Sequence, residues 1–176
     1  MKILGIDPGL NGGFAVIDTT IDPFLYSMQI MPVRKDGAVD GKFIFDWVLA
    51  QKVDSAFFED VHSIYGIGAK QNFNLGINIG IIKGSLNCAG VEYKLVQPKE
   101  WQASCHQGVY SKEVRAKDKT LDAATRLYPD LVKRLTPQKT ARMKYDPKPH
   151  DGLIDALMIA HYGKIIREVK PSLNVL

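Results

Sequence analysis

The sequence predicts an α/β fold in which a mixed five-stranded sheet is flanked by helices. Three short strand-like runs, at 2–7, 13–18 and 24–31, follow one another with only turn signals between them, which is typical of an antiparallel meander. Two further runs, at 55–61 and 92–97, are each preceded by a helical pattern, which is typical of parallel crossovers. Three antiparallel strands followed by alternating helices and strands make a mixed sheet with helices packed against it.

The first two strands are predicted to form a hairpin. The run Lys2-Ile3-Leu4-Gly5-Ile6-Asp7 is short and apolar, as in a buried strand, and Pro8-Gly9 is a turn signal that ends it. A second apolar run then leads to Asp18. Helical patterns are expected at about 40–52, 73–89, 112–134 and 150–167, and we expect the whole chain, 1–176, to form a single domain.

The helical pattern at 73–89 carries a glycine at every fourth residue. Gly76, Gly80 and Gly84 share one face, with Phe73 and Ile77 nearby. Glycine in a helix costs about 1 kcal/mol relative to alanine, so three of them indicate a close approach of another backbone. The simpler interpretation, which we favour, is tight packing on the sheet. The alternative is a helix pair across a dimer interface.

Composition favours an ordinary globular protein. The chain of 176 residues is 45% hydrophobic and 24% charged. No apolar stretch approaches the ~20 residues of a membrane helix, and no leader precedes the first strand, so a cytoplasmic protein with no membrane partner is expected. The two cysteines, Cys88 and Cys105, have no metal-site spacing, and we expect both to be reduced thiols.

The net charge of +4 hides an asymmetry along the chain. Residues 1–60 hold five basic and nine acidic side chains, whereas the later part holds 18 basic and 10 acidic ones. Such a split predicts a polyanionic partner. Nucleic acid is the leading candidate, because its binding draws on Lys and Arg contacts to phosphates.

Three carboxylates in apolar surroundings predict a metal site. Asp7 ends the first strand, Glu59 follows Ala56-Phe57-Phe58, and Asp155 lies within an apolar helical run. A buried carboxylate is costly unless it is paired, hydrogen-bonded or bound to a metal. Carboxylate oxygens suit Mg²⁺ or Mn²⁺ rather than zinc. Two such ions about 3.5–4 Å apart can activate a water and stabilise the leaving oxygen of a phosphodiester.

Asp151 and Asp155 lie four residues apart and so share a helix face. The helix dipole is a sufficient structural reason for Asp151, which lies near the expected helix start. Asp155 has no such reason, and two carboxylates on one face repel each other unless a cation lies between them. We therefore interpret both as candidate metal ligands.

These motifs together resemble the RuvC-type Holliday junction resolvases of the ribonuclease H-like superfamily. The resemblance rests on Gly5-Ile6-Asp7-Pro8-Gly9-Leu10, on Phe58-Glu59 and on Asp155-Ala156-Leu157-Met158-Ile159-Ala160, and it runs from Met1 to about Gly163. Residues 73–84 also resemble the small-residue helix that follows the catalytic glutamate in that family. The resemblance implies a homodimer that nicks symmetric strands of four-way DNA junctions with Mg²⁺.

By motif position, the resemblance implies that Asp7, Glu59 and Asp155 are the catalytic metal ligands. Family members usually have Asp or His three residues before the last aspartate, where this chain has Gly152. Asp151 is expected to substitute, joining Asp7 and Asp155 at one ion while Asp7 and Glu59 hold the other. His150 is expected to face elsewhere.

The expected DNA contacts come from two basic segments and one loop. The segments are 111–119 and 136–149, the second of which leads directly into the acidic helix, and a lysine from either one is expected to offset charge at the phosphorus. The family places an aromatic residue shortly after the glutamate, where this chain has His62 and then Tyr65. The basic residues named as DNA contacts are Lys112, Lys117, Lys119, Lys139, Arg142, Lys144 and Lys148.

Other functions stay open at this point. Actin-like kinases also begin with a strand and Asp-x-Gly, but they need two such domains, for which 176 residues leave no room. A broader branched-DNA nuclease, an RNA–DNA hybrid nuclease and a non-catalytic junction-binding protein are the alternatives. Some viral members of the family look like general branch-cutting enzymes, so a phage or viral origin, with action in the host cytoplasm, is one expectation.

Overall fold

The strands form one mixed five-stranded sheet, as predicted, and their order across it is β3 (Leu25–Ile30), β2 (Gly13–Asp18), β1 (Lys2–Asp7), β4 (Ser55–Glu59), β5 (Tyr93–Val96). This computed structural model describes residues 1–21, 25–63, 66–107, 115–140, 144–145 and 147–169. β1, β2 and β3 pair antiparallel, and β4 and β5 add parallel strands on the other side of β1.

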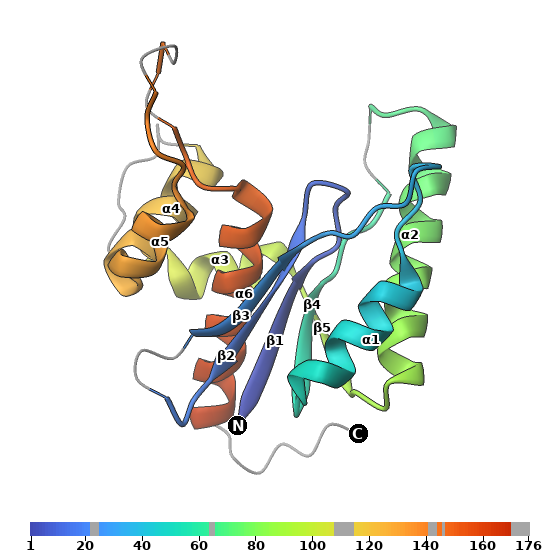
Figure 1. The fold of residues 1–176 in the computed structure, drawn as a ribbon, viewed down its shortest axis with the longest axis horizontal. Coiled ribbons are helices and arrows are strands. Elements are labelled where there is room, and N and C mark those ends of the chain that lie inside the picture. Colours follow the sequence, from blue (N-terminus) through green and yellow to red (C-terminus); the bar gives the residue numbers. More distant parts are fainter. Residues whose placement is uncertain (22–24, 64–65, 108–114, 141–143, 146, 170–176) are drawn as a thin grey trace.

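Helices cover both faces of the sheet (Figure 1). The α1 and α2 helices lie on one face, and α3 to α6 lie on the other. In the described part of the chain the helices are α1 (Gly41–Gln51), α2 (Ala69–Cys88), α3 (Pro98–Cys105), α4 (Ala116–Leu127), α5 (Pro129–Leu135) and α6 (Asp151–Val169). None of these described helices is both long and apolar enough to cross a membrane.

Two helix predictions need correction. The single helix expected at 112–134 is wrong over its described part, because the chain breaks at Tyr128 (φ −138°) and Pro129 starts a new helix. Proline has no N–H and disfavours helical backbone in the residue before it, so it suits a helix start and not a helix interior. The α3 helix was not predicted. Pro98 occupies its first turn, and Gln97 and Glu100 form a capping box there.

Alternating side chains of the strands build two cores. Ile3, Ile17 and Phe57 are buried against the α3–α6 layer. Leu4, Ile6 and Val16, which alternate with them, are buried under α1 and α2. This period of two is what a sheet covered on both faces requires.

The α6 helix packs on β1 with almost no space between the backbones. A Cβ on Gly5 would lie 2.1 Å from the carbonyl oxygen of Ala156 and 2.4 Å from the amide nitrogen of Ala160. Any residue larger than glycine at position 5 would push the helix away. The contact holds the first half of α6 against the strand that ends at Asp7.

The glycines of α2 make no such contact, so the favoured interpretation, tight packing on the sheet, is wrong. Among the described residues, a Cβ on Gly76, Gly80 or Gly84 would meet no atom within 4 Å. Phe73 is 70% exposed and Ile77 is 43% exposed. The helix packs on the sheet through other residues, including the buried Ile82 and Leu86. Its glycine face is left open, and the dimer interface stays a prediction.

Candidate active site

Asp7 and Glu59 end neighbouring parallel strands. Ile6 of β1 pairs with Phe58 of β4, so the residue after each one lies at the same edge of the sheet. The carboxyl ends of parallel strands are where α/β folds place their ligand sites. The two carboxylates are brought together by strand register although 52 residues separate them in the chain.

The close packing of α6 on β1 adds Asp155 to this pair. Burial, followed by the negative charges of Asp7 and Glu59, raises the pKa of Asp155 to about 7. Burial also raises the pKa of Asp7 and that of Glu59. The three carboxylates therefore form one electrostatically coupled group, and each of them is partly withdrawn from water.

Two hydrogen bonds partly offset the cost of burying these carboxylates. The Gly9 amide donates to Asp7 Oδ1 at 3.1 Å, which lowers the pKa of Asp7. The Trp101 indole Nε1–H donates to Glu59 Oε1 at 2.9 Å, which lowers the pKa of Glu59. Burial outweighs both bonds, so the site keeps an unfavourable concentration of negative charge that a cation would relieve.

The donor chemistry of this group fits Mg²⁺ or Mn²⁺. All donors are carboxylate oxygens, the ligands that these ions prefer. Within the described residues, however, no three His, Cys, Asp or Glu side chains are grouped closely enough to hold a metal ion together. The carboxylates are coupled through their charges and do not converge on one point.

An open cleft of about 570 Å³ exposes part of the site. Asp7, Asp155 and Lys117 line it together with the turn after β1 and the start of α6. Glu59 does not line this cleft. Its side chain accepts a hydrogen bond from Trp101 of α3. The residues around the cleft are Asp7, Gly9, Leu10, Asn11, Gly12, Lys117, Pro149, His150, Asp151, Gly152 and Asp155.

His150 also lines the cleft, so the expectation that it faces elsewhere is wrong. Its positive charge, when protonated, lowers the pKa of Asp7. The expectation projected His150 onto the helix, but α6 begins at Asp151. The His150 carbonyl accepts hydrogen bonds from the Leu153 and Ile154 amides, so His150 caps the helix from outside it.

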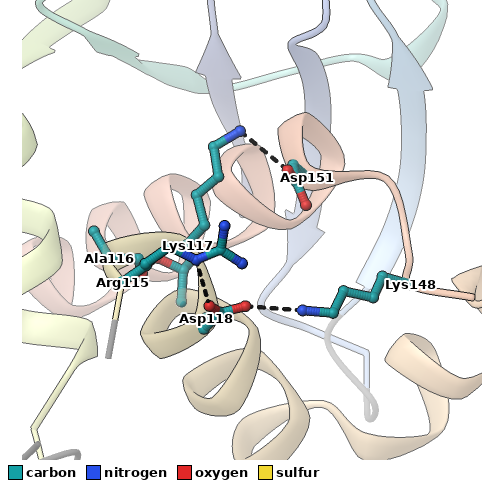
Figure 2. A network of polar contacts seen from close by, with 7 residues as sticks. Arg115, Ala116, Lys117, Asp118, Lys148 and Asp151 are labelled. Carbon is teal, nitrogen blue, oxygen red and sulfur yellow. Dashed lines mark hydrogen bonds and ion pairs between the residues drawn. The ribbon is translucent and has the colours of Figure 1, made fainter. Parts of the chain in front are cut away.

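Among the described residues, Lys117 is the one predicted DNA contact that lines the cleft. Its Nζ donates to Asp151 Oδ2 at 3.0 Å, and this bond raises the pKa of Lys117. Figure 2 shows the lysine reaching from α4 toward Asp151 at the start of α6. Asp151 is exposed and held by Lys117, whereas Asp155 is half-buried near Asp7.

A second set of ion pairs lies beside the first. Lys148 Nζ donates to Asp118 Oδ1 at 2.9 Å, and Arg115 Nε donates to Asp118 Oδ2 at 2.9 Å (Figure 2). The start of α4 supplies Lys117 and Asp118 to these pairs. The start of α6 supplies Asp151, and the loop before it supplies Lys148. These exposed pairs contribute little stability individually, but together they orient two lysines near the cleft.

Among the described residues, the other predicted DNA contacts do not line this cleft. Lys144 packs its Nζ over the Tyr145 ring, 5.5 Å from its centroid. Lys119 lies near His106, whose pKa is lowered by burial and, to a smaller extent, by the charge of Lys119. His62 is 73% exposed, with Nε2 3.5 Å from Asp60 Oδ2. Lys139 lies in the 136–149 loop, and Tyr65, Lys112 and Arg142 lie outside the described residues.

The absence of a side chain at Gly152 has a steric reason. A Cβ there would lie 2.2 Å from the carbonyl oxygen of Asn11 and 2.5 Å from the Cα of Gly12. An aspartate or histidine, as the family resemblance predicts at this position, would collide with the turn after β1. Trp101, which donates to Glu59, was not predicted from the sequence as a site residue. The signal that could have found it is the proline and capping box at the start of its helix.

Solved structures share this architecture. Thermus thermophilus RuvC matches with a TM-score of 0.64 and 15% identity, and the same organism's RuvC in complex with a Holliday junction substrate matches with 0.65 and 14%. Each match covers 96% of this chain and 96% of the other.

The fold is that of RuvC. It is ribonuclease H-like, as the resemblance implied. The yeast mitochondrial Holliday junction resolvase Ydc2 also matches, with a TM-score of 0.47 and 11% identity over 91% of this chain and 76% of its own. The sequence matches no protein-family model and no curated protein.

Proposed function

We propose that this protein is a divalent-metal-dependent endonuclease that nicks branched DNA, with four-way junctions as its principal substrate. The observation that carries the proposal is the coupled group Asp7, Glu59 and Asp155, assembled from β1, β4 and α6 at one edge of the sheet. Support comes from the RuvC fold over 96% of the chain, since one matching RuvC was solved with a Holliday junction substrate.

Asp7, Glu59 and Asp155 would hold Mg²⁺, or Mn²⁺ in its place, and two ions per site are proposed as in other carboxylate nucleases. Bound ions of this type make a water nucleophilic near neutral pH and stabilise the departing oxygen. Asp151 is a weaker candidate ligand than the sequence suggested, because it is exposed and paired with Lys117.

The chain's own groups prepare the site for a phosphodiester. Lys117 places a positive charge beside Asp7 and Asp155, and among the described lysines it is best placed to meet a phosphate entering the cleft. Its partner Asp151 keeps the ammonium group oriented while the cleft is empty of DNA. Lys144 and Lys148 extend the positive charge away from the cleft along the loop before α6.

The open glycine face of α2 supports a homodimer. Symmetric nicking of a junction requires two active sites, and a second copy of the chain would cover Phe73, Ile77 and the α2 glycines. Exposed apolar side chains around small residues are suited to such a contact.

The test is cleavage of a labelled mobile four-way junction in Mg²⁺, beside a Y-fork and an RNA–DNA hybrid. The proteins compared are the wild type, Asp155→Asn, and Asp122→Asn as a matched control from the exposed face of α4. Paired symmetric nicks by the wild type and the control, with none by Asp155→Asn, are expected.

Other outcomes would revise the proposal in defined ways. Equal cutting of the fork would widen it to a general branch nuclease, and cutting of the hybrid alone would replace DNA junctions with RNA–DNA hybrids. Tight junction binding without cutting by any of the three proteins would show that the carboxylates are not catalytic.

A further inference from the structure

We propose that Trp101 is a positioning residue for Glu59. Its indole holds one oxygen of the carboxylate and leaves the other oxygen available to a divalent cation. This inference rests on the proposed function, because it assigns a role in metal binding to a residue that does not itself offer a ligand atom. The α3 helix, which was not predicted from the sequence, would then be part of the active site.

The contact between the two side chains is buried and polar. Trp101 is 1% exposed, and its Nε1–H donates to Glu59 Oε1 at 2.9 Å. A buried indole N–H needs an acceptor, and a charged carboxylate is a strong one. The Trp101 ring belongs to the core between the sheet and α6, together with Phe57 and Cys105. The ring therefore cannot turn away from Glu59 without disturbing that core.

A second bond from the same helix holds the next residue of the chain. Gln97 Nε2 donates to Asp60 Oδ2 at 2.7 Å, and the Asp60 amide donates to the Val96 carbonyl at 2.8 Å. Gln97 is the N-cap residue just before α3, and Trp101 lies at the first turn of that helix, so both donors come from the start of α3. The end of β4 is thus held at two successive residues by one helix turn.

The start of α3, where both donors lie, is itself fixed by local features of the sequence. Pro98 lies in the first turn, and the Glu100 side chain accepts from the Gln97 amide in the capping box. These features set the direction of α3 relative to β5, whose last residue is Val96. Holding the side chain in one conformation matters most for Glu59, because glutamate has one more rotatable bond than the aspartates of the site.

Residues that hydrogen-bond a metal ligand typically change metal affinity by about 10- to 100-fold when they are replaced. Glu59 is the carboxylate reached from α3 and does not line the main cleft, so its approach to an ion depends on this support. Trp101→Phe keeps an aromatic ring in the core and removes the N–H donor.

The experiment measures Mn²⁺ binding by isothermal titration calorimetry without DNA. It compares the wild type, Trp101→Phe, Glu59→Ala and the double variant. Trp47→Phe is the matched control, since it removes the other indole N–H of the chain, on the opposite face of the sheet where Trp47 packs on Phe14. We expect Trp101→Phe to weaken Mn²⁺ binding about tenfold or more, Trp47→Phe to leave it unchanged, and Trp101→Phe to add no further loss to Glu59→Ala.

A second measurement needs only the wild-type protein. In ¹H–¹⁵N spectra, Mg²⁺ is expected to shift the indole resonance of Trp101 and not that of Trp47. If Trp101→Phe does not fold, an unmoved Trp101 resonance still overturns the proposal.

The remaining outcomes separate this inference from the function on which it rests. Unchanged Mn²⁺ affinity in Trp101→Phe, with weakened binding in Glu59→Ala, would overturn the role of Trp101 and keep the nuclease proposal. An equal loss from Trp101→Phe in both backgrounds would also overturn it, because the effect would not pass through Glu59. A wild type that neither binds Mn²⁺ nor cuts junctions would overturn both.

Discussion

Two helices of this protein carry small residues at every fourth position, and the two rows serve opposite purposes. In α6 the row is Gly152, Ala156 and Ala160, and it lies against β1 and the turn after it. In α2 the row is Gly76, Gly80 and Gly84, and no described atom lies within 4 Å of where their Cβ atoms would be. The same spacing therefore means close internal packing in one helix and an open surface in the other.

The two rows of small residues also have different proposed roles. The α6 row brings a carboxylate-bearing helix so close to β1 that Asp155 is half-buried near Asp7. The raised pKa of Asp155 shows that its charged form is disfavoured there. The α2 row approaches nothing in its own chain, so it is suited to a second copy. One row builds the proposed active site, and the other would build the proposed assembly.

The largest expected effect comes from filling the space between α6 and β1. In Gly5→Ala the new Cβ would meet backbone atoms of Ala156 and Ala160, which cannot rotate out of the way. We expect a loss of about 3 kcal/mol or more in the free energy of unfolding, together with loss of junction cleavage. Chemical denaturation of the purified variant checks the first effect.

The matched control for that variant is Gly76→Ala, where the same methyl group enters open space. It should leave cleavage by the individual site intact. If Gly5→Ala were as stable as the wild type, the small residues of α6 would not pack closely against β1.

The next largest effect concerns the charge that close packing buries. Burial and the neighbouring charges raise the pKa of Asp155 to about 7 from its ordinary value of 3.8. The folded state then binds the proton more tightly than the unfolded state, so this group's contribution to stability is full below about pH 4 and is lost as pH rises toward 7. Asparagine cannot ionise, and Asp155→Asn should therefore be more stable than the wild type above pH 7 by roughly 1–3 kcal/mol.

That difference should vanish near pH 4, and denaturation midpoints at several pH values in EDTA measure it. Asp122→Asn, at an exposed position, should show no such pH dependence. Adding Mg²⁺ at pH 8 should stabilise the wild type and not Asp155→Asn, because ligand binding to the folded state adds to its stability. Equal stability of Asp155→Asn and the wild type at every pH would show that Asp155 is not held in a desolvated, negatively charged site.

A smaller effect is expected on the open row. Gly80→Ala should raise the stability of α2 in the monomer by up to about 1 kcal/mol, because alanine favours helix and the methyl group meets nothing. The same methyl group should weaken self-association if two α2 helices approach closely. Sedimentation velocity over a range of concentrations measures association, and thermal unfolding of dilute protein measures stability. Unchanged association would place any dimer contact elsewhere on the surface.

The comparison shows what could be inferred from the sequence and what could not. Strand periodicity and turn residues were enough for the sheet, and the ends of two parallel strands were enough to bring Asp7 and Glu59 together. The glycines of α2 could not be interpreted in the same way, because a spacing of four shows which residues share a face and not what covers that face.

Local exceptions to periodicity caused the other errors. His150 lies just before the first residue of α6, so a helical projection misplaced it. The apolar pattern predicted a single helix, but Pro129 ends that helix and starts another. Trp101 lies in a helix of eight residues, too short to show a clear period, and its role depends on a hydrogen bond across 42 residues of sequence.

The smallest expected effect tests which side of the sheet faces DNA. Lys144 lies in the loop before α6, whereas Lys42 lies on α1, on the opposite face, where it pairs with Asp46. Each phosphate contact contributes about 0.9 to the slope of log K against log salt concentration, so Lys144→Ala should weaken junction binding and reduce that slope by about 1. Lys42→Ala should leave the slope unchanged. Binding titrations at four or more salt concentrations measure both slopes. A wild-type slope in Lys144→Ala would show that this lysine does not contact DNA. A reduced slope in Lys42→Ala would place the DNA on the side of α1 and α2. The open glycine row would then face the junction and not a second protein chain.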